Sequence, residues 1–267
     1  MDLSIRGGQV PAIGLGTWAM VGQTCTDAVA GALAKGYRLI DTAQDYDNED
    51  EVGRGIVRSG VNREDIFLVT KVRPSNFSYE MTIRSTHESL RRLNTPFVDL
   101  LLMHWPNPQV PLEETLTAML RLQEEKKIKH IGVSNFSPSL VEEALQYADI
   151  FCNQIEFHPY LSQEKLIAQS KNKGYFLMAY CPLAKGRVSD EQVLKKIAES
   201  QGKSASQVAL RWIHQQGLVP IPKAASEGHQ KTNFAIFDFR LTDEEMAAID
   251  DLDKGLRLDP VSIYTEE

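Results

Sequence analysis

Eight short apolar runs recur along the chain, and each is followed by a stretch with the spacing and end signals of a helix. Nearly continuous apolar strands, without polar alternation, are typical of a parallel sheet buried on both faces. Eight β–α units in series favour a closed (β/α)8 barrel, the TIM barrel, over an open doubly wound sheet, which stays the structural alternative. The predicted strands cover residues 13–17, 39–43, 66–71, 97–104, 128–134, 151–156, 176–181 and 218–223.

Capping residues, glycines and prolines mark the helix ends. Ser137-Pro138 opens one helix with proline at its first position, and Thr242 with Glu245 forms a capping box before another. Pro106 and Pro108 delay the helix that follows the fourth strand. The other helices are predicted over residues 26–34, 48–58, 78–93, 112–125, 162–172, 189–201 and 204–216, and the last over 242–253.

The bulk composition is that of an ordinary globular protein. No linker interrupts the 267 residues, so we expect one domain over residues 1–267. The net charge of -7, without a basic stripe, argues against a nucleic-acid or anionic-membrane partner. No apolar run approaches the roughly 20 residues of a membrane helix, and the three cysteines lack metal-ligand or disulfide spacing. These features predict a cytoplasmic protein.

Several chemically useful side chains are predicted at one end of the barrel, because the carboxyl ends of its strands meet at a single face. Asp41, Lys71 and His104 end three of the strands, and Tyr46 follows in a loop. We expect Lys71 to lower the pKa of Tyr46, Asp41 to keep Lys71 charged, and His104 to donate a hydrogen bond to an incoming oxygen. Considered separately, Asp41 could be a helix cap, Lys71 a solvated lysine at the barrel rim, and His104 a core histidine. The same face should also present Ser134, Asn135, Gln154, Glu156, Tyr180 and Lys223.

Two segments resemble the signatures of a known family. Residues 36–43, Gly-Tyr-Arg-Leu-Ile-Asp-Thr-Ala, with Glu49 and Val52-Gly53 beyond them, resemble the first signature of the aldo-keto reductases. Residues 131–136, Ile-Gly-Val-Ser-Asn-Phe, resemble the second, and the bacterial diketogluconate-reductase-like branch looks nearest. The resemblance implies a TIM barrel, reduction of aldehydes and ketones by a nicotinamide cofactor, and a catalytic tetrad of Asp41, Tyr46, Lys71 and His104.

The resemblance also implies a cofactor site, in which Ser134, Asn135 and Gln154 hold the nicotinamide carboxamide and Tyr180 stacks on its ring. The family grips the 2′-phosphate of NADPH with a lysine, a serine and an arginine; here Ala224 and His229 replace the last two. A neutral histidine cannot fork onto phosphate as a guanidinium does, so we expect NADPH to bind with weaker discrimination against NADH. The full predicted set is Gly16, Thr17, Ser134, Asn135, Gln154, Tyr180, Pro182, Leu183, Lys223, His229 and Asn233.

The substrate pocket is predicted to include Trp18, Trp105 and Arg73. In relatives both tryptophan positions form apolar walls, although either residue could be core at the barrel end. Arg73 could receive the carboxylate of a keto acid or diketo sugar acid, or be a solvated loop arginine.

Three further features lie outside the tetrad: Asp45, Cys181 and the tail after Gly255. Asp45 is interpreted as a solvated loop acid, and Cys181 as a small buried side chain rather than a reactive thiol. The polar tail after Gly255 is short, which predicts an open pocket mouth that Ile263 or Tyr264 could cover.

Two other functions stay open. A barrel metallohydrolase could use Asp41, His104, Glu156 and His158, but the His-x-His pair at an early strand end is absent. A non-enzymatic protein that senses nicotinamide cofactors for a membrane channel would not need the tetrad. We therefore expect a monomeric enzyme with NADPH as cofactor, a small carbonyl compound as substrate and no metal.

Overall fold

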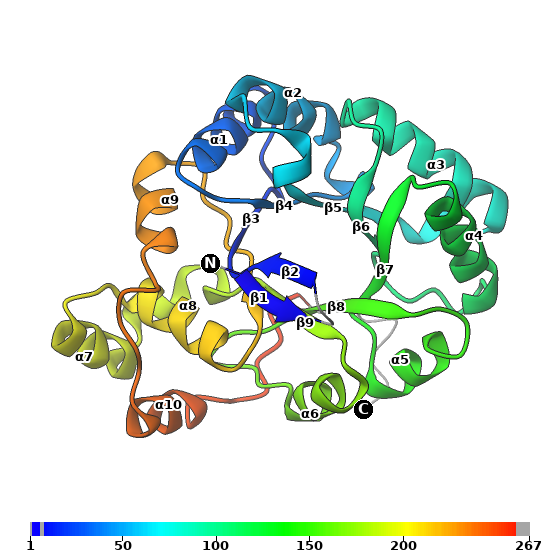
Figure 1. The fold of residues 1–267 in the computed structure, drawn as a ribbon. Helices are drawn as coiled ribbons and strands as arrows, with labels where there is room; N and C mark the ends of the chain where they lie inside the picture. The colour runs from blue at the N-terminus through cyan, green and yellow to red at the C-terminus, as the bar shows by residue number, and fades with distance from the viewer. Residues whose placement is uncertain (1, 6–7, 260–267) are drawn as a thin grey trace.

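Eight parallel strands are hydrogen-bonded in chain order, from β3 to β10, in the computed structural model, which describes residues 2–5 and 8–259. A parallel bridge joins Gly16 to Lys223, and the Gly16 amide donates to the Pro222 carbonyl at 3.2 Å, so the sheet closes on itself (Figure 1). The predicted TIM barrel is confirmed, and the open sheet is wrong. The strands are β3 (Gly14–Gly16), β4 (Leu39–Asp41), β5 (Phe67–Val72), β6 (Val98–Met103), β7 (Ile128–Ser134), β8 (Ile150–Glu156), β9 (Phe176–Tyr180) and β10 (Val219–Pro220).

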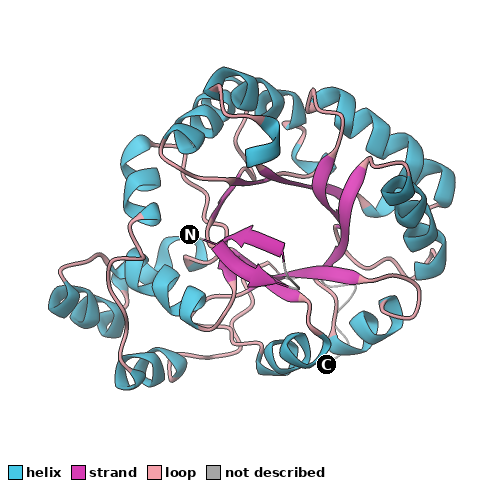
Figure 2. Cartoon of the chain, in the orientation of Figure 1, coloured by secondary structure: helices cyan, strands magenta, loops and turns pink. Residues whose placement is uncertain are grey.

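Helices surround the barrel on its outside (Figure 2). A large apolar cluster fills the layer between helices and sheet, and within the described residues no helix could span a bilayer by its length and apolarity. The helices are α1 (Gly22–Ala34), α2 (Glu49–Ser59), α3 (Tyr79–Arg92), α4 (Leu112–Glu124), α5 (Pro138–Ala144), α6 (Glu164–Lys173), α7 (Gln192–Gln201), α8 (Ala205–Gln215), α9 (Glu227–Phe234) and α10 (Asp243–Asp250).

An antiparallel hairpin lies across one end of the barrel (Figure 1). Its strands are β1 (Asp2–Ile5) and β2 (Gly8–Pro11), and Val10 packs with the apolar cluster inside the barrel. The hairpin leads into the start of β3, so it covers the end at which the parallel strands begin. The hairpin does not cover the opposite end, where the strands finish, so a functional site is expected there.

Two predicted helix starts have the side-chain caps that the sequence indicates, whereas Ser78 precedes α3 without a side-chain cap hydrogen bond. Ser137 accepts from the Leu140 amide before α5, and Thr242 with Glu245 forms the capping box of α10. The N-terminal hairpin and α9 were not predicted, because the hairpin strands are too short to show a period and α9 is largely polar. The helix predicted from residue 26 begins earlier, at Gly22.

Candidate active site at the carboxyl ends of the strands

Lys71 and Asp41 form a buried ion pair at the ends of β5 and β4. Both side chains are almost fully enclosed, and Lys71 Nζ lies 2.7 Å from Asp41 Oδ1. The ammonium also donates to the Thr42 carbonyl at 2.9 Å and to the Tyr46 hydroxyl at 3.2 Å. A buried ammonium needs such partners, because a charge without them is costly to remove from water. Burial lowers the pKa of Lys71, and Asp41 opposes that shift.

Tyr46 lies in a short 3-10 turn, η1 (Gln44–Tyr46), which Asn48 ties to the barrel. Asn48 Oδ1 accepts from Thr42 Oγ1 at 2.7 Å, and Nδ2 donates to the carbonyls of Thr17 and Met20 at 2.9 and 3.0 Å. Asn48 therefore uses its whole amide to fix the loop after β4, and Tyr46 is held against Lys71 as a result. The sequence predicts only that Asn48 begins a helix.

The pKa of Tyr46 lies well above that of a free phenol, mainly because of burial, with further increases from the carboxylates of Asp41, Asp259 and Asp45. The expectation that this pKa would be lowered is not met, because burial and the nearby carboxylates raise it. Asp41 offsets the lysine charge, and the pocket excludes water that would solvate a phenolate. Tyr46 therefore stays protonated until a strong base accepts its proton.

His104 follows β6 (Val98–Met103) and lies beside Tyr46, with 5.6 Å between the ring centroids. Its Nδ1 is 2.8 Å from Asp45 Oδ2. Asp45 in turn lies 3.3 Å from Arg73 Nε, and Arg73 also donates to the Gln44 carbonyl. Asp45 is 38% exposed, as expected of a solvated loop acid, but it is also a partner of both His104 and Arg73.

The residues expected to hold the nicotinamide form one connected cluster across β7, β8 and β9. Tyr180 donates its hydroxyl to Asn135 Oδ1 at 2.9 Å, and Asn135 Nδ2 donates to Ser134 Oγ at 3.0 Å. Ser134 Oγ donates to the Gln154 carbonyl at 2.9 Å, and Gln154 Nε2 donates to Asp41 Oδ2 at 2.7 Å. The cluster thereby shares the Asp41 carboxylate with Lys71.

The first strand end contributes less directly. Thr17 is buried and its hydroxyl donates to the Asp41 carbonyl at 2.9 Å, which positions β4 against β3. Gly16 adjoins the backbone of the last strand, and Trp18 is 58% exposed beside Lys223. Lys223 is exposed and donates to the Ala19 carbonyl at 3.1 Å.

The segment expected to meet the cofactor's phosphate lies at the start of α9. Ser226 caps this helix by accepting from the His229 amide, and the His229 side chain is exposed. Asn233 and Ala224 are buried instead. The exposed Lys223 and the start of α9 could together bind an anion. Tyr180 is half-buried, and because Asn135 holds its hydroxyl, its ring is fixed for stacking against a flat ring. The residues present thus fit a nicotinamide dinucleotide.

The comparisons with known proteins agree on one family. Residues 12–254 match the aldo/keto reductase family. The chain is 43% identical to a glyoxal reductase of Bacillus subtilis, over 96% of this chain and 93% of that protein. This chain belongs to the aldo-keto reductase family.

Solved structures of other aldo-keto reductases superpose closely on this one. A crystal structure provisionally named as a 2,5-diketo-D-gluconic acid reductase B is 43% identical, with a TM-score of 0.96 over 99% of this chain and 96% of that chain. A Bombyx mori aldo-keto reductase solved in complex with NADP is 31% identical, with a TM-score of 0.92 over 99% and 97% of the two chains. The expected family, its diketogluconate-reductase-like branch and the oxidoreductase chemistry are confirmed.

The remaining predicted residues of this aldo-keto reductase lie around the mouth of the barrel. Trp105 is half-buried and adjoins His104, with 6.2 Å between the ring centroids. Cys181 follows β9 with a left-handed φ of 53°, ahead of Pro182 and Leu183. Burial raises the pKa of Cys181 to about 11, which supports a small inert side chain over a reactive thiol.

Glu156 and His158, which the metallohydrolase alternative needs, pair with each other at 2.9 Å. Glu156 also accepts from the backbone amides of Leu258 and Asp259, at 2.6 and 3.1 Å, and so attaches the end of the described chain to the barrel. Among the described residues, no group of three or more acidic, histidine or cysteine side chains could hold a metal ion. Ile263 and Tyr264, predicted to cover the mouth, lie outside the described residues.

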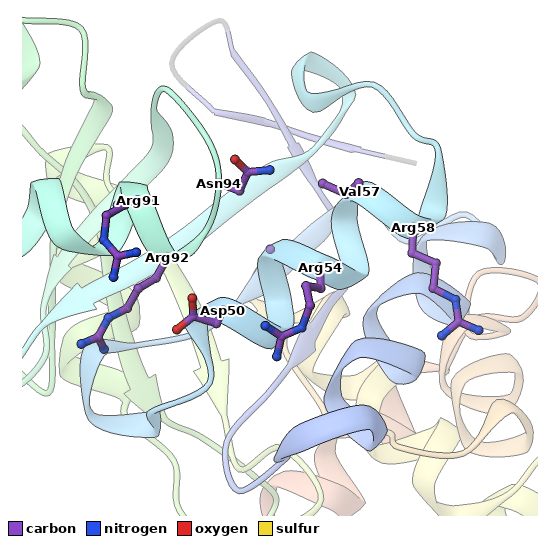
Figure 3. A pocket seen from close by; sticks show the side chains of 8 residues that line it. Asp50, Arg54, Val57, Arg58, Arg91, Arg92 and Asn94 are labelled. Carbon is purple, nitrogen blue, oxygen red and sulfur yellow. The ribbon is translucent and has the colours of Figure 1, made fainter.

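A surface pocket of about 410 Å³ lies between α2 and α3 (Figure 3), and no tetrad residue lines it. Four arginines line it, but each is paired with an acid: Arg54 with Glu51, Arg58 with Asp27, and Arg91 and Arg92 with Glu88. Such paired surface charges leave little net attraction for an anion.

Proposed function

We propose that this aldo-keto reductase reduces small aldehydes and ketones through Asp41, Tyr46, Lys71 and His104, with NADPH as its preferred cofactor. The observation that carries the proposal is the position of Lys71 Nζ, which lies within hydrogen-bond distance of both Asp41 and the Tyr46 hydroxyl. The two contacts place a charged amine beside a protonated phenol at the mouth of a barrel.

The tetrad residues act on the proton and on the developing charge. When bound, the reduced nicotinamide supplies a hydride to the carbonyl carbon. Tyr46 gives its proton to the carbonyl oxygen, which becomes a stronger base than phenolate as it gains charge. Lys71 stabilises the phenolate left on Tyr46, and Asp41 keeps Lys71 in place. His104 donates a hydrogen bond to the same oxygen and orients it.

The substrate that suits this pocket mouth is an uncharged carbonyl compound rather than a keto acid. Arg73 is the nearest candidate for a carboxylate, but its guanidinium lies 3.3 Å from Asp45 and 3.5 Å from Asp47. A substrate carboxylate would have to displace these acids and would also meet the field of Asp259. The relatives named glyoxal reductase and, from Escherichia coli O157:H7, methylglyoxal reductase DkgB fit this class.

A substrate panel tests the proposal. We expect NADPH oxidation with a simple aldehyde and with methylglyoxal at higher kcat/KM than with a 2-keto acid or a diketo sugar acid. In Arg73→Ala, KM should change equally for the aldehyde and the keto acid. A preference for the keto acid, with a selective rise of its KM in Arg73→Ala, would restore Arg73 as the carboxylate receptor.

Cofactor choice is expected to be less strict than with a full phosphate clamp. Replacing His229 by arginine should raise the ratio of kcat/KM for NADPH over NADH about tenfold, the equivalent of one added charge-assisted hydrogen bond. His87→Arg, which adds the same charge at an exposed position on α3, is the matched control and should leave the ratio unchanged. An equal rise in both variants would mean that net charge, not a local contact, sets the ratio.

We also infer that the protein acts as a cytoplasmic monomer. Its three cysteines, Cys25, Cys152 and Cys181, are free, which suits a reducing compartment. Light scattering of the purified protein should give a mass of 30.0 kDa, and twice that value would show a dimer.

A further inference from the structure

Asp45 lies at the barrel mouth and contacts a tetrad residue, but it has no role in the proposed mechanism. Its two carboxylate oxygens are divided between two partners: Oδ2 lies 2.8 Å from His104 Nδ1, and Oδ1 lies 3.3 Å from Arg73 Nε. Arg73 is itself held by the Gln44 carbonyl, and its own amide donates to Gln44 Oε1 at 3.1 Å. The carboxylate is therefore fixed from both sides.

The contact determines which nitrogen of His104 carries a proton. An ionised carboxylate can only accept, so His104 Nδ1 must be the donor in this hydrogen bond. In the neutral ring Nε2 is then an acceptor, and it becomes a donor only when the ring takes a second proton. Within residues 2–5 and 8–259, the only side-chain hydrogen bond of His104 is made through Nδ1, which leaves Nε2 available to a reacting oxygen.

We propose that Asp45 is a positioning residue that holds His104 with Nδ1–H bound to the loop, so that His104 can donate to a carbonyl oxygen through Nε2 only as an imidazolium. The inference rests on the proposed function, because it assigns the protonation state that His104 needs in that reaction. Arg73 contributes by anchoring the Asp45 carboxylate rather than by binding substrate.

The charged groups around His104 set the balance between its two states. The pKa of His104 is lowered overall, because burial outweighs the hydrogen bond that His104 donates to Asp45, which raises it. Lys71 on β5 also lowers this pKa, and Asp41 on β4 raises it. Tyr46 packs edge-on against the ring and stays protonated. In return, the hydrogen bond from His104 lowers the pKa of Asp45, which keeps the carboxylate ionised.

The proposal gives carbonyl reduction a defined pH dependence. Reduction requires the imidazolium, so kcat/KM should fall as pH rises through the pKa of His104. Alcohol oxidation instead releases a proton and should prefer the neutral ring at higher pH. Removing the Asp45 charge takes away a cause that raises this pKa, so the fall in reduction should start at lower pH.

The test compares Asp45→Ala and Asp45→Asn with a matched control, Asp47→Asn. Asp47 also contacts Arg73, at 3.5 Å, but has no contact with His104, and asparagine tolerates its left-handed φ of 49°. Nitrogen NMR of the imidazole rings in the cofactor-free protein reports the tautomer and pKa directly. The chain has six histidines, and the signal missing in His104→Gln identifies the one of interest.

In the wild type and in Asp47→Asn, the neutral His104 ring should carry its proton on Nδ1. The asparagine of Asp45→Asn can still accept a hydrogen bond from His104 Nδ1 but lacks the charge, so the pKa of His104 should fall while its tautomer is kept. In Asp45→Ala the pKa should fall and the tautomer should no longer be fixed. Aldehyde reduction at neutral pH should then fall several-fold in kcat, because less of His104 is protonated, and should recover at lower pH.

An Nε2–H tautomer in the wild type, or an unchanged His104 pKa in Asp45→Ala, would overturn the proposal. The NMR measurement does not need turnover, so it stands even if the enzyme reduces no aldehyde. Conversely, wild-type activity that survives in Tyr46→Phe would reject the proposed function and leave the tautomer result intact. Thermal unfolding of each variant shows whether it is folded, and Asp45→Asn preserves the shape of the side chain if Asp45→Ala does not fold.

Discussion

Lys71 is a fully buried lysine, and it forms an ion pair with the carboxylate of Asp41. Each member of this pair would be strongly unfavourable without the other, because an isolated charge in a barrel interior cannot recover its hydration. The Asp41 carboxylate accepts from Gln154 as well, so removal of Lys71 would leave it with one neutral side-chain donor. The pair therefore links stability to the chemistry of Tyr46.

Lys71→Met is expected to lower the free energy of unfolding by about 3–5 kcal/mol, the usual cost of leaving one member of a buried ion pair unpaired. Adding Asp41→Asn to this variant should recover part of the loss, because the uncompensated charge is then gone. Denaturant unfolding of the single and double variants measures both effects. A single variant as stable as the wild type would show that Asp41 finds another partner.

At the scale of single residues, the sequence predicts which tetrad residues lie together but not how their pKa values change as a result. The tetrad follows from strand ends in a barrel. The raised pKa of Tyr46 does not, because it depends on burial and on Asp259, which lies far away in the chain. The contact of Asp45 with His104 does not follow either, because the two residues are 59 positions apart and nothing local marks the contact.

At the scale of elements, α8 contains a histidine that the proposed chemistry does not use. His214 Nδ1 is buried without a hydrogen-bond partner, and the ring packs edge-on against Phe237 at 5.2 Å between centroids. Burial, with a smaller effect of Arg211, lowers the pKa of His214 to about 4. The folded protein therefore binds a proton here less readily than the unfolded chain does.

This difference predicts an acid-side loss of stability. Between about pH 6.5 and pH 4 the unfolded chain binds a proton that folded His214 does not, so unfolding becomes easier as pH falls through this window. His214→Phe should remove about 1–2 kcal/mol of the loss between pH 7 and about pH 5, after allowance for partial exposure. Denaturant unfolding of both proteins at the two pH values is the measurement. Parallel losses in the two proteins would assign the acid sensitivity to other groups.

Element boundaries followed from the sequence where the signal was local. The Thr242 and Ser137 caps are examples, because a cap is made by residues within one helical turn. The N-terminal hairpin is not predicted because it is stabilised by packing against the barrel end, where Val10 joins the interior cluster. α9 was missed because its polar sequence has no apolar stripe to mark it.

At the scale of the whole molecule, closure of the barrel depends on close contact between its first and last strands. A Cβ at Gly16 would lie 2.7 Å from the backbone carbonyl oxygen of Ile221, which cannot move without opening the seam. The sequence showed Gly16 as part of a short glycine-rich strand. That it seals the barrel follows only from the position of Lys223 in space.

Gly16→Ala is expected to cost about 1–3 kcal/mol of stability, as overpacking against a fixed neighbour does. Gly228→Ala is the matched control, because a Cβ there would meet nothing within 4 Å and the residue lies in α9, where alanine is preferred. Thermal unfolding should show a lower midpoint for the first variant only. Equal midpoints would mean that the seam can relax.

The central claim is that Tyr46 is the proton donor of a nicotinamide-dependent carbonyl reductase. Tyr46→Phe removes one oxygen, leaves the ring beside His104, and should lower kcat/KM for a simple aldehyde with NADPH by about 10²–10⁴-fold. NADPH binding, followed by fluorescence, should be retained, which separates lost catalysis from lost cofactor. Aldehyde-dependent NADPH oxidation by the wild type together with its loss in Tyr46→Phe is the predicted result. Undiminished turnover in Tyr46→Phe would contradict the account.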